Sequence, residues 1–344
     1  MVVLLIPAYQ PGPALVSLVQ SCQRLGLSRV VVVNDGSSDA CRPVWQALSL
    51  LGVTVLSHPQ NRGKGAALKT GLAHVCAHIP QATGIVTADA DGQHRPEDIL
   101  RVAQGLQRHR VVLGSRDLTL AQVPWRSRVG NRLSSVLFRL LTGRACADTQ
   151  TGLRGFESSL FSRLLACEGE RYDYEMNVLI HLADRRIPWH VEKIATVYFN
   201  NNAASHFRPV RDSLRIYRRP LRFAASSLCG AGVDLVLFGL LTLLPTGIFN
   251  IFLATVLARC VSGAVNFTLN KMWSFSSTGN TRKELGRYGS LFLVQMLASY
   301  VLVQLLSFLP LPAVLWKIPV DVGLFFISYA VQRRWVYGQK GRTR

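Results

Sequence analysis

Short apolar runs alternate with stretches of helical periodicity along the N-terminal part of the chain. The strand-like runs are VVLLIPAY, SRVVVVNDGSSD, GVTVLSH, TGIVTADADG and RVVLGSR, and the helical stretches between them cover residues 14–25, 43–51, 65–78 and 96–108. This alternation predicts an α/β fold, in which a mostly parallel, Rossmann-like sheet carries helices on both faces. Such sheets bind ligands at the carboxyl ends of their strands. We therefore expect the functional residues where polar clusters follow these runs.

Four long apolar stretches follow Pro220. They cover residues 224–244, 248–270, 289–309 and 318–332, and the last extends back to about residue 314. Each is close to the ~20 residues that a helix needs to cross a bilayer. We predict an all-α transmembrane domain of four helices, arranged as two hairpins. The predicted organisation is an α/β domain at 1–206, an amphipathic interface helix or linker at 207–223, and the transmembrane domain at 224–344.

The distribution of charge supports a membrane protein. The 344 residues include 39 Lys and Arg against 19 Asp and Glu, a net charge of +20, yet the mean hydropathy is +0.22. Basic residues gather before the first apolar stretch, between the second and third, and after the fourth. By the positive-inside rule this predicts an integral protein of the plasma (inner) membrane with both termini cytoplasmic. Because the arginines follow membrane topology, we expect no nucleic acid partner.

Three ionisable residues, Asp234, Arg259 and Asp321, fall inside the apolar stretches. Charged groups are costly in a membrane and are usually paired there. We expect an Asp–Arg pair between helices, and Asp321 near a helix end. The seven cysteines are scattered, without a CxxC pair or a Cys/His cluster. This spacing predicts neither disulfides nor a zinc site. It favours a reducing compartment.

Three polar clusters follow the strand-like runs. Residues 34–39 (NDGSSD) end the second run and also suit an ordinary turn and helix cap. Residues 61–65 (NRGKG) precede a helix, where glycines and a lysine could approach a diphosphate. Residues 89–93 (DADGQ) offer two carboxylates and an amide oxygen, which suit Mg²⁺ or Mn²⁺. The alternative for this last cluster is a solvated acidic turn.

Taken in order, IPAY, VNDGSSD, NRGKG, DADGQ and GSR resemble the family 2 glycosyltransferases, which have the GT-A fold. The closer resemblance is to the polyprenyl-phosphate glycosyltransferases, such as dolichyl-phosphate mannose synthase and the GtrB proteins. It runs from Val2 to about Arg218. After it, RFAASSLCGAGVDLVLFGLL, VSGAVNFTLNKMWSF and ISYAVQRRWVY resemble the four-helix GtrA membrane domain.

The resemblance implies roles for individual residues on the donor side. The nucleotide would be bound by Pro7, Ala8, Tyr9, Asp35, Lys64 and Asp89, with Asp35 accepting from a base N–H. The metal would be held by Asp89, Asp91 and Gln93. Such a cation neutralises the diphosphate leaving group as the glycosidic bond breaks. The predicted cofactor is Mg²⁺ or Mn²⁺, and the predicted donor is a nucleotide sugar.

The acceptor side depends on residues 125–143, a basic amphipathic stretch. Its apolar stripe consists of Trp125, Val129, Leu133, Val136 or Leu137, and Leu140, flanked by Arg126, Arg128, Arg132 and Arg139. Such a helix lies in a membrane interface, the alternative being a core helix with solvated arginines. Residues 207–222 repeat the design. By resemblance the acceptor phosphate is held by Arg116, Ser127, Arg128, Asn131 and Arg154, with Arg126 a neighbour, and the strip that carries Asp148 and Arg154 closes the site.

The sequence departs from the family pattern in two places. Gln10-Pro11 replaces the usual Glu after the first-strand tyrosine, which affects the sugar or ribose contact. Residues 200–206 stand where the mannose synthases have an arginine and a Ser-Lys element, and His206 is the candidate substitute for that lysine. We expect His94 to support the metal loop or cap a helix. We expect Glu175 to line the cleft from a helix.

These features predict a membrane-bound inverting glycosyltransferase that moves a hexose from a UDP- or GDP-sugar to a polyprenyl phosphate of the undecaprenyl or dolichyl type. Asp91, Asp148 and Arg116 are the predicted catalytic residues, and Asp148 would be the base if the acceptor were a hydroxyl. One alternative is a glycolipid synthase with a lipid hydroxyl acceptor. Another is a lipid-sugar flippase or scaffold with an idle transferase domain. The membrane domain is expected to anchor the enzyme or to form a homo-oligomer.

Overall fold

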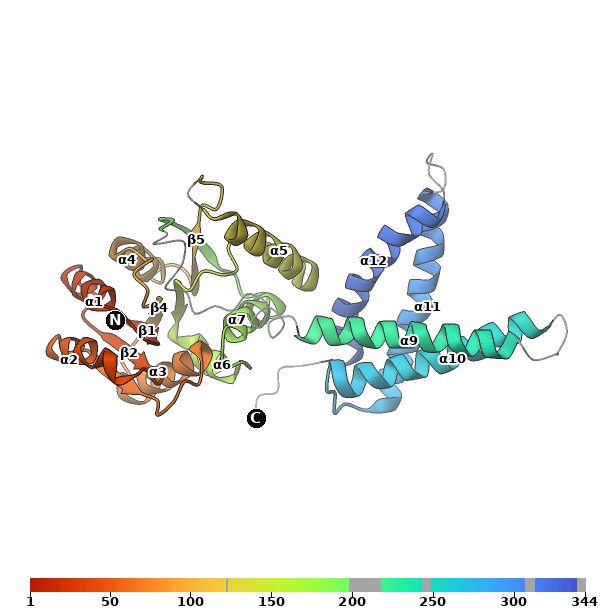
Figure 1. The fold of residues 1–344 in the computed structure, drawn as a ribbon, viewed down its shortest axis with the longest axis horizontal. Helices are drawn as coiled ribbons and strands as arrows, with labels where there is room; N and C mark the ends of the chain where they lie inside the picture. Colours follow the sequence, from red (N-terminus) through yellow and green to blue (C-terminus); the bar gives the residue numbers. More distant parts are fainter. Residues whose placement is uncertain (122, 198–217, 243–248, 307–312, 339–344) are drawn as a thin grey trace. The chain divides into compact units, whose positions relative to one another are not determined.

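The computed structural model describes residues 1–121, 123–197, 218–242, 249–306 and 313–338. The chain divides into two compact units, Met1–Ile216 and Tyr217–Arg344 (Figure 1). His206 and the predicted interface stretch up to residue 217 lie outside the described residues.

The first unit is built on one mixed sheet, as Figure 1 shows. Within the described residues its strands are β1 (Val2–Ala8), β2 (Val30–Asn34), β3 (Thr54–Ser57), β4 (Gly84–Thr87), β5 (Val111–Arg116), β6 (Arg154–Glu157) and β7 (His190–Ile194). Their order is β3-β2-β1-β4-β6-β5-β7, and all neighbours are parallel except β6, which runs antiparallel to β4 and β5. The α/β fold with a mostly parallel sheet is therefore confirmed.

Helices cover both faces of this sheet. They are α1 (Ala14–Arg24), α2 (Arg42–Leu50), α3 (Lys64–His78), α4 (Pro96–Gly105), α5 (Trp125–Thr142), α6 (Phe161–Ala166) and α7 (Asp173–Asp184). Successive residues of a strand point to opposite faces, so β1 supplies two separate cores. Leu5 packs into the core that contains residues of α3, α6 and α7, whereas Leu4 packs into the core that contains residues of α1, α2 and α4. The loops at the carboxyl ends of the parallel strands lie between these layers.

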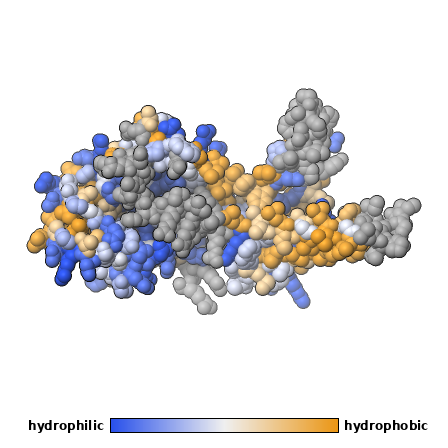
Figure 2. Space-filling view, in the orientation of Figure 1, coloured by the Kyte–Doolittle hydropathy of each residue, from blue (hydrophilic) through white to orange (hydrophobic). Residues whose placement is uncertain are grey.

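The second unit is helical. It contains α9 (Arg218–Thr242), α10 (Phe249–Leu269), α11 (Thr281–Leu306) and α12 (Ala313–Val331), and π-helical turns at Asn270–Ser274 and Gln332–Val336 follow α10 and α12. Two stretches in the described residues, Pro220–Leu241 and Thr281–Leu306, are long and apolar enough to cross a membrane. Large apolar side chains such as Leu228 and Leu235 are exposed there, and Figure 2 shows apolar residues over the surface of α9 and α10. The four predicted helices are present.

Three features of this unit can be compared with the sequence prediction. Helix α9 runs without a break through residue 223, so the described end of the predicted interface stretch belongs to the first membrane helix. Arg259 Nε lies 3.6 Å from Asp234 Oδ2, which confirms the predicted Asp–Arg pair between helices. The prediction that Asp321 lies near a helix end is wrong, because α12 begins at Ala313 and Asp321 lies in its middle. Asp321 accepts a hydrogen bond from Ser299 Oγ at 2.8 Å.

Candidate active site

Two acidic residues follow β4, at the carboxyl edge of the sheet. Asp89 and Asp91 are half-buried. Lys64, the first residue of α3, places its Nζ 2.7 Å from Asp89 Oδ1 and 2.8 Å from Glu175 Oε2 of α7. The predicted nucleotide and metal loops therefore meet through Lys64. Glu175, which was expected to line the cleft from a helix, is the second partner of that lysine.

The electrostatics of this cluster separate its two aspartates. Burial alone would raise the pKa of Asp89, but the nearby Lys64 ammonium and His94 outweigh burial and hold that pKa well below its usual value. The pKa of Asp91 is raised, first by burial and then by the charge of Asp89. The pKa of Lys64 is raised because Asp89 and Glu175 together outweigh the effect of burial. Because the charge of Asp89 raises the pKa of Asp91, a cation bound between the two carboxylates would be favourable.

The donor set at this loop fits a hard divalent cation. Mg²⁺ is commonly held by one or two carboxylates and completes its shell with substrate phosphates and water. Asp89 and Asp91 supply those carboxylates, and the Gln93 backbone N–H donates to Asp91 Oδ1 at 3.0 Å, which orients it. The described residues contain no group of three or more His, Cys, Asp or Glu side chains placed to bind a metal. The phosphates of a bound nucleotide would therefore supply the remaining ligands.

Gly152 gives the strip after α5 its close approach to the acidic loop. A Cβ atom at this position would lie 2.4 Å from Asp89 Oδ2, so a larger residue here would require the Asp89 carboxylate to shift.

Asp35, predicted to contact the base, is buried at the end of β2. Its Oδ1 accepts from the Arg62 backbone N–H at 2.9 Å and lies 2.8 Å from His58 Nδ1, and its Oδ2 accepts from the Gly63 N–H at 2.7 Å. His58 Nε2 in turn lies 2.9 Å from Thr70 Oγ1 of α3. A carboxylate has about four acceptor positions, so Asp35 keeps room for one more donor. Sequence reasoning missed His58, although it ends the run GVTVLSH, where a polar residue signals the sheet edge.

The glycines of NRGKG allow close packing against a neighbouring segment, and their approach to a diphosphate stays a prediction. Gly63 has φ +108°, and a Cβ there would lie 2.4 Å from Arg171 Cγ. A Cβ at Gly65 would lie 2.5 Å from Tyr174 Cβ. The Ala66 N–H also donates to the Glu170 carbonyl at 2.8 Å. These glycines are required by the segment before α7, which packs directly against the loop and brings Glu175 to Lys64.

The end of β1 carries the other residues predicted to bind the nucleotide. Pro7 and Ala8 are buried in the strand, whereas Tyr9 is 38% exposed. Gln10 has φ +51°, an uncommon conformation for a residue with a side chain. Its N–H donates to Ser37 Oγ at 2.9 Å and its Oε1 accepts from Ser38 Oγ at 2.9 Å. The residue that replaces the family glutamate therefore ties the first loop to the NDGSSD loop.

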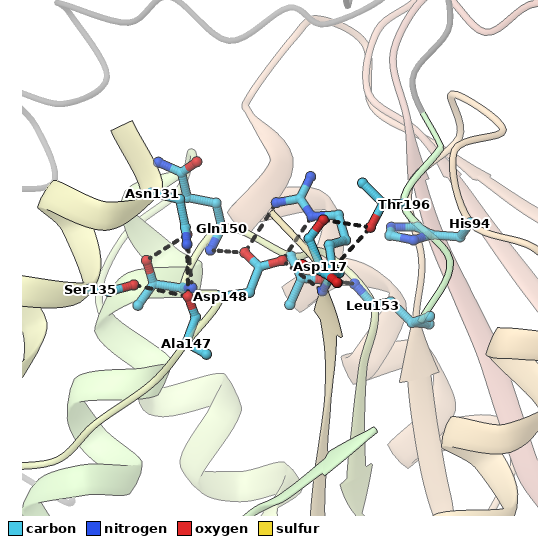
Figure 3. A network of polar contacts seen from close by, with 12 residues as sticks. His94, Asp117, Asn131, Ser135, Ala147, Asp148, Gln150, Leu153 and Thr196 are labelled. Carbon is cyan, nitrogen blue, oxygen red and sulfur yellow. Dashed lines mark hydrogen bonds and ion pairs between the residues drawn. The ribbon is translucent and has the colours of Figure 1, made fainter. Parts of the chain in front are cut away.

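Asp148 forms a closed ion pair with Arg116, and Figure 3 shows Asp148 within a network of polar contacts. Arg116 Nε donates to Asp148 Oδ2 at 2.8 Å and Nη2 donates to Oδ1 at 3.1 Å. The backbone N–H groups of Arg116 and Gln150 donate to the same carboxylate at 3.3 and 3.1 Å. The Asp148 side chain is 0% exposed. In this conformation the carboxylate has four donors and is turned away from solvent.

Two further residues predicted to hold the acceptor phosphate make hydrogen bonds to backbone groups in and around the strip at 147–154. Asn131 Nδ2 donates to the Ala147 carbonyl at 2.7 Å, and its Oδ1 accepts from the Thr149 N–H at 3.2 Å; Figure 3 shows Asn131 beside Ala147. Arg154 is buried and donates to the carbonyls of Thr151, Thr149 and Glu175 at 2.9, 3.0 and 2.7 Å. Both side chains form hydrogen bonds with backbone groups, so they stabilise the conformation of this strip.

The remaining predicted residues lie on or near α5. Ser127 is half-buried, and Arg128 is exposed with Nη2 donating to the Leu120 carbonyl at 3.1 Å. Arg126 is part of α5, and its side chain is outside the described residues. His94 is buried, with Nε2 3.4 Å from Asp89 Oδ2.

Helix α5 is amphipathic with its apolar stripe outward. Trp125, Val129, Leu133, Val136 and Leu140 are 68, 55, 63, 51 and 43% exposed. Arg128, Arg132 and Arg139 are exposed as well. The face that packs on the unit contains Asn131, Ser134 and Phe138, all buried. The core-helix alternative required the apolar stripe to be inside, so it is wrong.

Comparison with known proteins agrees with this geometry. Residues 3–165 match the family described as glycosyl transferase family 2, and residues 197–337 match the GtrA/DPMS transmembrane domain. A UDP-N-acetylglucosamine–dolichyl-phosphate N-acetylglucosaminyltransferase of Methanococcus voltae is 30% identical over 218 residues, which is 58% of this chain and 86% of the relative. The chain belongs to glycosyltransferase family 2. The predicted family is confirmed, and the second match makes the chain a membrane glycosyltransferase.

Two other similar proteins are more distant. An undecaprenyl-phosphate 4-deoxy-4-formamido-L-arabinose transferase of Edwardsiella ictaluri is 29% identical over 170 residues, covering 47% of this chain and 50% of the relative. A crystal structure of glucosyl-3-phosphoglycerate synthase from Mycobacterium tuberculosis, in complex with Mn²⁺, UDP and phosphoglyceric acid, has a TM-score of 0.48 at 18% identity. It covers 64% of this chain and 76% of that one.

Proposed function

We propose that this membrane glycosyltransferase moves a hexose from a nucleotide sugar to a polyprenyl phosphate at the cytosolic face of the plasma membrane. The observation that carries the proposal is α5. Its buried face holds the strip that closes the acceptor side, and its exposed face combines an apolar stripe with arginines. A helix of this kind lies in the headgroup region of a bilayer. An acceptor presented there would be a lipid whose polar end is anionic.

The donor side supports a nucleoside diphosphate sugar. A divalent cation on Asp89 and Asp91 would neutralise the charge that develops on the diphosphate as it leaves. Lys64 adds a buried positive charge beside the same loop, held at 2.7 Å from Asp89. With the cation bound, this edge of the sheet would bring two positive charges, the cation and Lys64, to the leaving group. An idle transferase domain has no need of this cluster, which argues against the flippase or scaffold reading.

The acceptor side supports a phosphate in preference to a hydroxyl. A hydroxyl acceptor needs a general base within hydrogen-bond reach of its proton. Asp148, the candidate base, already accepts four hydrogen bonds and has no exposed surface. A lipid phosphate is ionised before it reacts and needs no base. Asp148 then acts as the residue that positions Arg116 at the end of β5.

The reaction that follows from this arrangement is a single displacement. A phosphate oxygen of the lipid forms the new bond to the anomeric carbon, while the bond from that carbon to the nucleoside diphosphate oxygen breaks. The electron pair of the broken bond leaves with the diphosphate, and no proton is removed from the acceptor. Attack on the face opposite the leaving group inverts the anomeric configuration. The relatives named for dolichyl phosphate and undecaprenyl phosphate acceptors support this acceptor class.

Purified full-length protein in detergent with Mn²⁺ or Mg²⁺ would test the donor and acceptor together. UDP or GDP release is followed across a panel of nucleotide sugars, with and without undecaprenyl phosphate. We expect release with one donor class only, dependent on the lipid phosphate. Release that is equally fast without the lipid would contradict the proposed acceptor.

The role of α5 has its own test in vesicles that contain undecaprenyl phosphate. The variant Trp125→Ser with Leu133→Ser removes two exposed apolar side chains from α5, and Leu50→Ser removes one that is 89% exposed on α2. We expect the α5 variant to raise KM for the lipid and to leave KM for the nucleotide sugar unchanged, while Leu50→Ser changes neither. Equal effects of the two variants would show that α5 does not meet the lipid.

A further inference from the structure

The two hairpins of the membrane unit repeat one another in sequence. Arg222-Phe223 stands near the start of the first hairpin and Arg287-Tyr288 near the start of the second, and a Leu-Pro pair follows each arginine at the same spacing, at 244–245 and 309–310. The hairpins close on NKMWSF and QRRWVY. Both segments have the order amide, basic residue, any residue, tryptophan, any residue, aromatic residue. Self-similarity of this kind indicates a repeated structural unit.

The structure makes the same contact in each repeat. Arg222 Nη1 donates to the Trp273 carbonyl at 3.2 Å, and Arg287 Nη1 donates to the Trp335 carbonyl at 2.8 Å. Each guanidinium also lies over the ring of its tryptophan, at 5.6 and 5.9 Å from the ring centroid. Both tryptophans lie in the π-helical turns that follow α10 and α12. In each hairpin, an arginine of the first helix therefore contacts the tryptophan at the end of the second helix.

Contacts between the repeats occur in matched pairs, as a pseudo-twofold axis requires. The ring centroids of Phe223 in the first repeat and Tyr329 in the second lie 5.2 Å apart. Those of Tyr288 in the second repeat and Phe267 in the first lie 5.4 Å apart. Each residue of one pair is the sequence equivalent of a residue in the other. Two contacts instead join a residue to its own equivalent. Asn270 Nδ2 donates to Gln332 Oε1 at 3.1 Å, and the rings of Phe275 and Tyr337 lie 4.9 Å apart. The axis passes between these equivalent residues.

The Arg–Trp elements lie at the basic ends of the helices. Among the described side chains of this unit, the basic ones near these ends are Arg222, Lys271, Arg282, Lys283, Arg287, Arg333 and Arg334. The single acidic one described there, Glu284, is bonded to Lys271. Trp273 and Trp335 are 43 and 47% exposed. Tryptophan prefers the headgroup level of a bilayer, which places both elements where lipid phosphates are.

We propose that the membrane unit is a duplicated hairpin and that each copy holds one lipid phosphate at its Arg–Trp element. The guanidinium fork matches phosphate geometry, and the carbonyl and ring contacts fix its orientation before the lipid arrives. The inference is independent of sugar transfer, because none of these residues belongs to the candidate active site. The middle of the hairpins has diverged, since the Asp234–Arg259 pair of the first corresponds to Ser299 and Asp321 in the second.

Native mass spectrometry of the full-length protein in detergent measures the number of bound lipids directly. The protein is titrated separately with phosphatidylglycerol and with undecaprenyl phosphate, which separates a membrane phospholipid from the isoprenoid phosphate as the source of the ligand. The test variant is Arg222→Gln with Arg287→Gln. The control, Arg282→Gln with Lys283→Gln, removes the same number of positive charges, both from the start of α11. Monodispersity and helical circular dichroism confirm that each variant is folded.

We expect two tightly bound phosphates at the Arg–Trp elements of the wild type for at least one of the two lipids, in addition to any undecaprenyl phosphate bound at the proposed acceptor site. Loss of charge-assisted hydrogen bonds should weaken binding to the test variant by roughly tenfold or more, with less than about a threefold change in the control. Each single variant should lose one of the two. Equal losses in the test and control variants would overturn the proposal in favour of diffuse charge, and so would unchanged binding in the test variant. Arg222→Lys with Arg287→Lys retains the charge without the fork, and wild-type binding by it would overturn the role of the fork.

Discussion

Two acidic sites at the same edge of the sheet show opposite designs. Asp89 and Asp91 follow β4, are half-buried and lie close enough for the charge of Asp89 to raise the pKa of Asp91. Asp148 follows α5, has no exposed side-chain surface and shares its carboxylate with the Arg116 guanidinium and two backbone N–H groups. The first site gains from an added cation. The second already contains its cation, in the form of an arginine.

The contrast separates catalytic charge from structural charge. A carboxylate that already accepts hydrogen bonds from protein donors at all its positions cannot bind a substrate group. Two carboxylates that repel each other are stabilised by a bound cation. Asp35 is an intermediate case, because three donors hold it and one acceptor position remains. Substitutions at the three positions should therefore affect different quantities.

The largest effect on stability is expected at Asp148. The change Asp148→Ala removes the carboxylate that pairs with the Arg116 guanidinium and frees the strip at 147–150, because the side chain anchors both. Removing one partner of a buried ion pair costs about 3–5 kcal/mol of unfolding free energy. Thermal unfolding in detergent measures it. A variant as stable as the wild type would mean that the ion pair is not formed in solution.

The largest effect on activity is expected at Asp91. The change Asp91→Asn should lower kcat/KM by roughly 10²–10³, because a charge that stabilises the leaving group through the cation is lost. Its stability should equal or exceed that of the wild type, since the Asp89–Asp91 repulsion is removed. The control is Glu97→Gln, which neutralises an exposed carboxylate on α4 outside the site. If Asp91→Asn lost stability and retained activity, the two acidic sites would have to exchange roles.

Cation binding should be visible without any turnover. A ligand that binds only the folded protein stabilises it by mass action, by about 2.7 kcal/mol at a concentration one hundred times Kd. Mn²⁺ or Mg²⁺ together with UDP or GDP should therefore raise the Tm of the wild type, and chelation should reverse the rise. Asp91→Asn should show a much smaller rise, and Asp148→Ala should show the full one. A full rise in Asp91→Asn would place the cation elsewhere.

The smallest effect is expected at His58. The change His58→Ala removes a buried hydrogen-bond partner of both Asp35 and Thr70, which costs about 1–3 kcal/mol. Because Asp35 also holds the Arg62 and Gly63 backbone, the same change should raise KM for the nucleotide sugar and leave kcat almost unchanged. Steady-state kinetics with the donor varied measures this. A fall in kcat at constant KM would show that His58 acts on the reacting atoms.

Much of the architecture could be predicted from the sequence because it depends on local patterns. The alternation of apolar runs and helical periods predicts the α/β sheet, and the outward stripe on α5 is visible as Trp125, Val129 and Leu133 at helical spacing. The position of β6 could not be predicted in this way. It is antiparallel between β4 and β5, and that insertion depends on contacts between segments far apart in the sequence.

The candidate site was predictable at the level of residue type but not of partnership. Asp89, Asp91 and Lys64 lie together as the motifs suggest, since each follows or precedes an element at the sheet edge. Asn131 and Arg154 were expected to hold phosphate, and in the structure their partners are backbone carbonyls and N–H groups. These partners depend on burial, and burial is a property of the folded chain. The same holds for Gly63 and Gly65, whose small size serves packing against the segment before α7.

The central claim is that the acceptor is a phosphate that needs no base. The most direct measurement compares undecaprenyl phosphate with undecaprenol as acceptors for the same radiolabelled nucleotide sugar, with the lipid products separated and identified. The account predicts a labelled product with the phosphate, sensitive to Asp91→Asn, and none with the alcohol. Labelled product from the alcohol at a comparable rate would contradict it, and would require a base on the acceptor side that the closed Asp148–Arg116 pair does not provide.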